Sequence, residues 1–262
     1  MLVEIKKLLP HHPWCDTIQY FDTIDSTNTL AKALAAGGAP EGTVIIAGQQ
    51  TGGRGRLGRT FSSPAGMGIY LSVILRPDCL PEELMHLTCA AGVAASDAVA
   101  QHCGQHPGIK WTNDLVLGRR KLGGILTELS IDATTRKVAW AVVGIGINCC
   151  QQPEQFPEEI RDIACSLGIL QQDVPSLAAQ LIKALHNMCI HLFVKKDEIM
   201  AEFRTKCVTI GQDISILRGD SVTHAKAVGV NQDGGLEVIL ADGSKTTVTS
   251  GEVSIRGMYG YL

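Results

Sequence analysis

The sequence predicts a mixed α and β domain with a small β-barrel attached at its C-terminal end. Before Cys207, alanine- and leucine-rich helical segments alternate with short apolar strands. After Cys207, short β-type runs are separated by Gln232-Asp-Gly-Gly and Ala241-Asp-Gly-Ser, which are hairpin turn signals. A length of 262 residues accommodates both units. We therefore expect a main domain at residues 1–207 and a C-terminal domain at residues 208–262.

Local patterns predict the elements of the main domain in chain order. Strong helix formers follow Ser26 and Thr27, either of which could cap the helix, and the run stops at two glycines. Leucines recurring at helical spacing from Leu177 predict one long amphipathic helix that continues past Phe203. Predicted strands cover 43–47, 69–75, 124–130 and 138–147, the segment 109–116 contains a turn at Asn113-Asp114, and predicted helices cover 29–36, 84–100 and the long amphipathic segment.

Composition excludes several classes of protein. A net charge of −3 is unlike a nucleic-acid coat or a membrane-surface protein, which would be basic. The longest apolar run, from Ala139 to Ile147, is too short to span a bilayer, and the N-terminus lacks a signal-peptide core. Nine cysteines without a Cys-x-x-Cys pair indicate free thiols in a reducing compartment. We therefore expect a soluble cytoplasmic protein that binds neither nucleic acid nor membrane.

An arginine–glycine loop is the most informative local feature. No acidic residue occurs from Gly42 through Pro77, and Arg54, Arg56 and Arg59 alternate there with glycines. Glycines allow backbone N–H groups to turn toward a ligand, and arginine pairs with carboxylates or phosphates, so the loop predicts an anion site. It approximates a Walker A loop, but a strand rather than a helix is expected to follow it, which argues against that interpretation. A flexible RNA-binding segment is also disfavoured, because the motif occurs once and between strands.

Two further clusters complete the pattern. Lys110-Trp-Thr-Asn-Asp114 is followed by Lys121 and a glycine pair, and Gly144-Ile-Gly-Ile-Asn148 ends an apolar strand. Each cluster alone could be structural, since lysine and aspartate at a turn are often a solvated ion pair. Together with the arginine loop they predict a site where cations bring a carboxylate and phosphates together, which is the requirement for activating a carboxylic acid.

These motifs resemble the series found in biotin–protein ligases. The resemblance rests on Asp25-Ser-Thr-Asn28, Gln50-Thr-Gly-Gly-Arg-Gly-Arg-Leu-Gly-Arg59, Lys110-Trp-Thr-Asn-Asp-Leu115, Lys121-Leu-Gly-Gly124, Gly144-Ile-Gly-Ile-Asn148 and the terminal Gly251-Glu-Val-Ser-Ile-Arg256. It implies an α+β fold, with a mixed sheet like that of class II aminoacyl-tRNA synthetases and an SH3-like C-terminal barrel. It also implies ATP-dependent formation of biotinyl-5'-AMP and transfer of biotin to a lysine of a biotin carboxyl carrier protein, with Mg²⁺ accompanying ATP.

The resemblance assigns roles to particular side chains. Asp114 either contacts Mg²⁺ or orients the acceptor lysine, and both roles stay open; Phe61 is an aromatic ring suited to adenine stacking. The implied catalytic residues are Lys121, Arg56 and Asp114; the implied biotin-binding residues are Ser26, Thr27, Asn28, Gln50, Gly53, Arg54, Lys121 and Gly124; the implied ATP-binding residues are Arg54, Arg56, Arg59, Phe61, Lys110, Asn113 and Asn148.

Three alternative functions were weighed against biotin ligation. A lipoate or octanoate ligase would share the fold. The sequence lacks a stretch with paired arginines and three glycines ending in His-Asp, which resembles what that family carries. A biotin-responsive repressor would need a helix-turn-helix, which the 25 residues before Ser26 do not provide. A pure biotin-binding module would not need the arginine loop together with Lys110 and Lys121. The sequence leaves both a monomer and a homodimer open.

Overall fold

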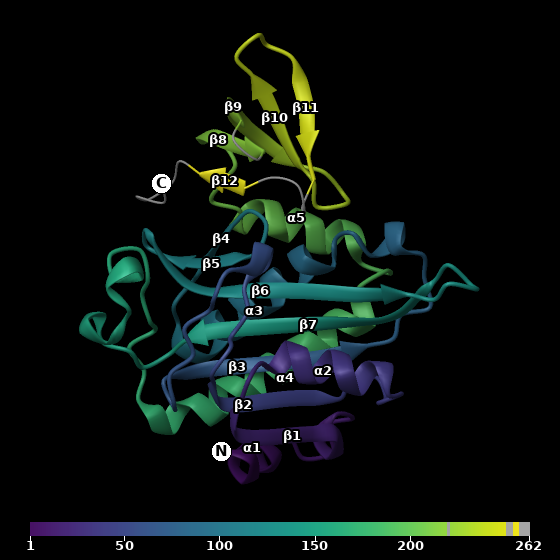
Figure 1. The fold of residues 1–262 in the computed structure, drawn as a ribbon, viewed down its shortest axis with the longest axis vertical. Coiled ribbons are helices and arrows are strands. Elements are labelled where there is room, and N and C mark those ends of the chain that lie inside the picture. The colour runs from purple at the N-terminus through teal and green to yellow at the C-terminus, as the bar shows by residue number, and fades with distance from the viewer. Residues whose placement is uncertain (219–220, 250–253, 257–262) are drawn as a thin grey trace.

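The computed structural model describes residues 1–218, 221–249 and 254–256. Its main body is a seven-stranded mixed sheet in the order β1-β2-β3-β7-β6-β5-β4 (Figure 1). The pair β1–β2 is parallel, and the other neighbouring strands of this sheet are antiparallel. The strands are β1 (Ile18–Ile24), β2 (Val44–Gln50), β3 (Gly68–Leu75), β4 (Gly108–Lys110), β5 (Asp114–Leu117), β6 (Arg120–Ile131) and β7 (Val138–Asn148).

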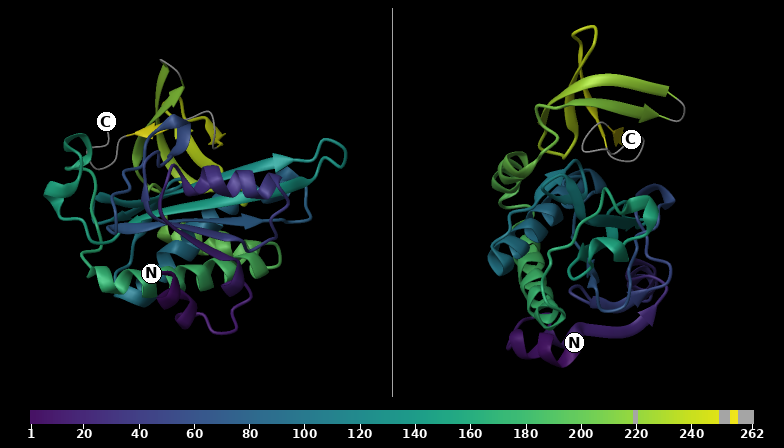
Figure 2. Two further views of the ribbon diagram at one scale, coloured as in Figure 1. Left: turned by 60° about the horizontal axis from the view of Figure 1, so that its bottom comes forward. Right: turned by 90° about the vertical axis from the view of Figure 1, so that its left-hand side faces the viewer.

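Helices cover both faces of this sheet. On one face α3 and α4 pack side by side, with α1 against α4 and α5 against α3. On the other face α2 packs across β2, β3 and β7 (Figure 2). The helices are α1 (Leu2–Leu8), α2 (Thr27–Ala36), α3 (Leu87–Cys103), α4 (Val174–His191) and α5 (Lys196–Lys206).

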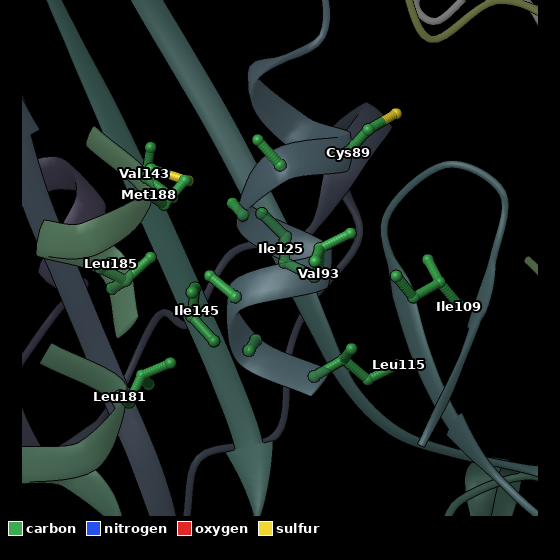
Figure 3. Close-up of a cluster of buried hydrophobic side chains, with 14 of the residues drawn as sticks. Cys89, Val93, Ile109, Leu115, Ile125, Val143, Ile145, Leu181, Leu185 and Met188 are labelled. Carbon is green, nitrogen blue, oxygen red and sulfur yellow. The ribbon is translucent and has the colours of Figure 1, made fainter. Parts of the chain in front are cut away.

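Alternation along the strands divides the core between the two faces. In β3 and β7, Val73 and Val143 belong to the large cluster under α3 and α4, whereas Ile74 and Val142 belong to the smaller cluster under α2. Figure 3 shows the large cluster, where side chains of α4 such as Leu185 meet those of α3 and of the central strands. Because both faces of β3 are covered, all eight of its residues are buried.

The long helix predicted from Leu177 past Phe203 is wrong. The structure instead has two helices, α4 and α5, separated by residues 192–195. At the junction Leu192 is buried and its carbonyl is bonded at 2.8 Å by the imidazole Nε2 of His86. The break lets α5 turn onto α3 and bury Phe203, which a continuous helix along the axis of α4 would not do.

The C-terminal part is a five-stranded antiparallel sheet in the order β11-β10-β9-β8-β12. Both predicted hairpin turns are confirmed, since Gln232-Asp-Gly-Gly joins β9 to β10 and Ala241-Asp-Gly-Ser joins β10 to β11. The predicted fold class, a mixed sheet with helices followed by a small β unit, is also confirmed. Residues 251–253 of the predicted last strand lie outside the described residues. The strands are β8 (Asp213–Arg218), β9 (Ser221–Val230), β10 (Leu236–Leu240), β11 (Lys245–Val248) and β12 (Ser254–Arg256).

Two further expectations concern the whole chain. All nine cysteines are free, as the sequence predicted, and four of them are fully buried. Across the described segments, no helix combines the length and the apolar character needed to cross a membrane.

The core contribution of α4 can be tested with two substitutions on the same helix. Leu185→Ala removes a side chain that is 0% exposed, and we expect it to lower the free energy of unfolding by about 2–5 kcal/mol. Ile190→Ala, at a residue that is 58% exposed, should change it by less than about 0.5 kcal/mol. Urea unfolding followed by circular dichroism measures both. Equal losses from the two variants would contradict the packing described above.

Candidate functional site

A cavity of about 490 Å³ opens on the α2 face of the sheet, with β6 and β7 as its floor. The floor is made of backbone where β7 carries Gly144 and Gly146. A Cβ at Gly144 would collide with the amide of Asn28, and one at Gly146 would lie 2.5 Å from the ring of Phe61. The glycines of the Gly-x-Gly-x-Asn motif are therefore required by packing. Because they have no side chains, Asn28 and Phe61 can lie directly against the strand, and space for a ligand remains beside them.

Neutral hydrogen-bonding groups form one end of the cavity, at the N-terminus of α2. The backbone N–H and the hydroxyl of Thr27 both donate to Gln50 Oε1, at 2.8 and 3.1 Å. The other end of the same amide, Gln50 Nε2, donates to the hydroxyl of Ser63 at 2.8 Å. Ser26 occupies the N-cap position but its side chain makes no capping bond, so the predicted capping role is wrong for the hydroxyl.

Asn28 lines the cavity, but its polar atoms are bonded within the protein. Its Nδ2 donates to Leu126 O and to Glu128 Oε2, and its Oδ1 accepts from the hydroxyl of Ser72 at 2.6 Å. Glu128 also pairs with Lys32 at 2.5 Å. Asn28 is 4% exposed. These bonds make it a support for Thr27 and the neighbouring cavity wall.

Basic side chains form the other end. Among the described residues that line the cavity, five are basic and two, Asp114 and Glu159, are acidic; the basic ones are Arg54, Arg56, Arg59, Lys110 and Lys121. Asp114 forms an ion pair with Lys121 at 2.6 Å. Burial lowers the pKa of Arg56 and that of Lys110, and the charge of Asp114 opposes both shifts. The site therefore holds an excess of positive charge in partly dehydrated surroundings.

The arginine–glycine loop is a narrow turn that carries Arg56 into the cavity. Arg54 and Thr60 form an isolated antiparallel bridge, and Gly55 N donates to Arg59 O at 2.6 Å. Arg56 donates to Asn113 Oδ1 at 3.0 Å and is half-buried, whereas Arg54 and Arg59 are exposed. No helix follows the loop before β3, which confirms that it is not a phosphate-binding P-loop.

Arg54 lies close enough to Glu128 for their charges to interact. Burial opposes ionisation of Glu128, but hydrogen bonds from Lys32 and Asn28 and the charge of Arg54 hold its pKa below the ordinary value. The charge of Arg54 therefore favours the ionised form of the same glutamate that supports Asn28.

The remaining predicted residues divide between lining and support. Phe61 lies over Gly146 and meets Tyr70 edge-on at 6.4 Å. Asn148 lines the cavity, but its Nδ2 donates to Cys165 O at 3.0 Å and its Oδ1 accepts from a neighbouring glutamine. Gly53 lies outside the lining, and a Cβ there would collide with the Phe61 carbonyl, so it serves the loop turn. Gly124 lines the cavity with ordinary space around it.

One wall of the cavity was missed by the sequence analysis. Lys121 bonds on both sides to an irregular segment, through its N to Ile163 O at 2.7 Å and through its O to Cys165 N at 2.9 Å. This segment contributes Phe156, Glu159, Ile160, Ile163 and Ala164 to the lining. It has neither periodicity nor a motif that would single it out in the sequence. Trp111 also lines the cavity, and nothing in the local sequence distinguishes it from the other residues of its motif.

The fold and the cavity together define a class of protein. A mixed sheet carries one hollow with a neutral hydrogen-bonding end and a strongly cationic end. Such a hollow suits an enzyme that joins an acid with a neutral body to a phosphorylated group, because two anions can approach each other only where fixed cations surround them.

Comparisons with known proteins agree with this class. The model of the Biotin/lipoate A/B protein ligase family matches residues 20–148, and that of the biotin protein ligase C-terminal domain matches residues 209–256. The bifunctional ligase/repressor BirA of Bacillus subtilis is 33% identical over 237 residues, covering 86% of this chain and 70% of that protein. The biotin–[acetyl-CoA-carboxylase] ligase of Mycobacterium tuberculosis is 33% identical over 231 residues, covering 86% and 83%.

A solved structure gives the same answer. The biotin protein ligase of Aquifex aeolicus, in complex with biotin and ATP, superposes with a TM-score of 0.75 at 30% identity and covers 91% of this chain and 98% of its own. The chain belongs to the biotin/lipoate protein ligase family, and within it to the biotin protein ligases.

The backbone floor of the cavity can be tested with two glycine substitutions. Gly146→Ala places a methyl group 2.5 Å from Phe61, so either the ring or the strand must move, and we expect a loss of about 1–3 kcal/mol in the free energy of unfolding. Gly124→Ala, on the neighbouring strand, meets its nearest atoms at 3.6 Å and should change stability by less than about 1 kcal/mol. Denaturant unfolding compares the two. A Gly146→Ala variant as stable as the native chain would contradict the packing of Phe61.

Proposed function

We propose that this chain joins biotin to ATP, forming biotinyl-5'-AMP, and then transfers the biotinyl group to a lysine of a biotin carboxyl carrier protein. The observation that carries the proposal is a single cavity in which the neutral Thr27–Gln50 end faces Arg56, Lys110 and Lys121. Biotin has a neutral ureido ring, an apolar chain and a carboxylate, and these three parts match the cavity from its neutral end to its cationic end.

In the first half-reaction a carboxylate oxygen of biotin attacks the α-phosphorus of ATP. A new C–O–P bond forms, the bond to the β-phosphate oxygen breaks, and pyrophosphate leaves. Lys121 and Arg56 stabilise the charge that collects on the phosphorus oxygens, while Lys110 lies deeper in the same wall. Phe61 offers a ring over the β7 glycines against which adenine can stack.

In the second half-reaction the neutral amine of the acceptor lysine attacks the acyl carbon of the mixed anhydride. An amide bond forms, the acyl–phosphate bond breaks, AMP leaves, and the amine gives up a proton. Asp114 pairs with Lys121 at 2.6 Å, which suits it either to orient the incoming amine or to contact a phosphate-bound cation. The acceptor follows from the name of the Mycobacterium tuberculosis relative, which specifies acetyl-CoA carboxylase.

The carboxylates of the cavity bear on the Mg²⁺ requirement. Within the described part of the chain, no group of three or more histidine, cysteine, aspartate or glutamate side chains converges on a point. Asp114 and Glu159 line the cavity from different segments. Mg²⁺ would be held mainly by the phosphates of ATP, whose charge it would neutralise, and Asp114 would be the residue placed to add a ligand.

Pyrophosphate release tests this function. With ATP, the native chain should release pyrophosphate when biotin is present, and neither lipoate nor the absence of an acid should support release. Release with lipoate and not with biotin would show that lipoate is the substrate. No release with any acid would refute the proposed enzymatic activity. Transfer is measured separately, as a mass increase of a purified biotin carboxyl carrier domain.

A matched pair of variants distinguishes a specific role of Lys121 in the reaction from the general effect of losing one positive charge. Lys121→Ala should lower the rate of adenylate formation by about 100-fold or more, since a preorganised cation of the reaction centre is removed. Lys137→Ala is the matched control, because Lys137 forms an equally short ion pair with Asp78, at 2.6 Å, on an exposed turn. The control should keep the native rate. Comparable rates for the two variants would remove Lys121 from the reaction centre.

The buried amine of Lys110 predicts a limit to activity at alkaline pH. Because burial lowers its pKa, Lys110 loses its proton at a lower pH than an exposed lysine, and the binding of phosphate should weaken as it does. The value of kcat/KM for ATP should therefore be constant at neutral pH and fall as pH rises through this lowered pKa. Lys110→Arg should retain activity and shift the fall to higher pH, since arginine stays charged. Identical alkaline limbs in the two proteins would refute this assignment.

A further inference from the structure

A hairpin of the C-terminal sheet contacts the wall of the cavity directly. The wall residue is Trp111, which lines the cavity and is 5% exposed. Its indole Nε1 donates to Gly234 O at 2.7 Å, in the turn between β9 and β10. Its backbone N donates to the hydroxyl of Thr209 at 2.8 Å, just before β8 begins. Two bonds from one wall residue therefore reach the chain beyond the main sheet.

The turn that presents Gly234 O is shaped by one side chain. Asn231 Oδ1 accepts from Asp233 N at 3.0 Å and from Gly235 N at 2.8 Å. Gly234 has φ +86°, and a Cβ there would lie 2.9 Å from the sulfur of Cys89 on α3. The carbonyl can therefore face the indole only while Asn231 holds the turn and position 234 lacks a side chain.

Helix α5 holds the same hairpin from the other side. Arg204 Nε donates to Val230 O at 2.6 Å, and its other nitrogen donates to Gln232 at 2.9 Å. Lys196 pairs with Asp233 at 2.7 Å. The turn is thus fixed between α5 and Trp111, and movement of the turn would be transmitted to the indole.

Trp111 adjoins the cationic end of the cavity in sequence and in space. Lys110 precedes it, and Asn113, two residues later, accepts the hydrogen bond of Arg56. The neutral end, at Thr27 and Gln50, is built by α2 and β2 and has no bond to the hairpin. A shift of Trp111 would therefore displace the phosphate-binding groups and leave the biotin-binding end in place.

We propose that Trp111 is a positioning residue through which the β9–β10 turn sets the geometry of the nucleotide-binding end. The inference rests on the proposed function for its assay, although ATP affinity measured directly tests it as well. The indole N–H is the coupling group, and Asn231 acts through it by presenting the carbonyl of Gly234.

A double-mutant cycle tests the coupling. Trp111→Phe keeps an aromatic ring and removes the N–H donor, and Asn231→Ala releases the turn without touching the cavity. Each should raise KM for ATP by about three- to tenfold, the size expected from one lost hydrogen bond, and leave KM for biotin unchanged. The KM for ATP of the double variant should not exceed that of the single variant with the higher KM, because both substitutions remove the same interaction.

The matched control is Asp242→Ala. Asp242 Oδ1 accepts from the N and the hydroxyl of Ser244, so it shapes the β10–β11 turn by the same kind of bond, on an exposed surface. Its KM for ATP should stay native. A purely structural role of Trp111 would lower the melting temperature and the active fraction with both KM values unchanged, and that result overturns the proposal. Multiplicative effects in the double variant overturn it too.

The assay also separates the inference from the proposed function. If the native chain releases no pyrophosphate with biotin, the proposed function fails, and four of these proteins, the native chain, the two single variants and Asp242→Ala, are then compared by calorimetric titration with ATP. Weaker ATP binding in Trp111→Phe and Asn231→Ala, but not in Asp242→Ala, still supports the coupling. Equal ATP affinity in all four proteins refutes it.

Discussion

Mutual repulsion among cations is the constraint on which the site depends. The lining brings together Arg56, Lys110 and Lys121, which repel each other until an anion arrives. Asp114, one of two acidic residues among the described residues of the lining, offsets part of this repulsion, because it pairs with Lys121 and favours the charged forms of the other two. Asn113 then holds the guanidinium of Arg56 without adding charge. The result is a preorganised excess of positive charge that Asp114 partly compensates.

The neutral end meets the opposite requirement, because its polar groups must be satisfied without any ion near the ligand. Thr27 donates a hydrogen bond to Gln50, Asn28 donates one to Glu128, and Glu128 pairs with Lys32. Lys32 and Glu128 pair with each other outside the lining of the cavity. The charge of Arg54, in the arginine–glycine loop, also favours the ionised form of Glu128.

Much of the site could be predicted from sequence because its chemistry is written in short local motifs. The arginine loop, the lysines and the β7 glycines converge as expected, and the strand after the loop excluded a P-loop. The roles of Asn28 and Asn148 could not be predicted, since their bonding partners are supplied by distant segments. At the break between α4 and α5, the carbonyl of Leu192 is bonded by His86, a residue far away in the chain. The wall formed by residues 156–164 has no periodicity and therefore no signal.

The bare floor of β7 has a genetic consequence. Every single-base change in a glycine codon that alters the residue introduces a side chain or ends translation. At Gly144 even the smallest of these would collide with Asn28, and at Gly146 it would meet Phe61. Every single-base substitution that alters the residue at either position is therefore expected to disturb the packing, whereas a Cβ at Gly124 on the adjacent strand meets its nearest atoms at an ordinary contact distance of 3.6 Å. Substitutions that reshape the cavity are therefore expected in its walls and not at Gly144 or Gly146 of its floor.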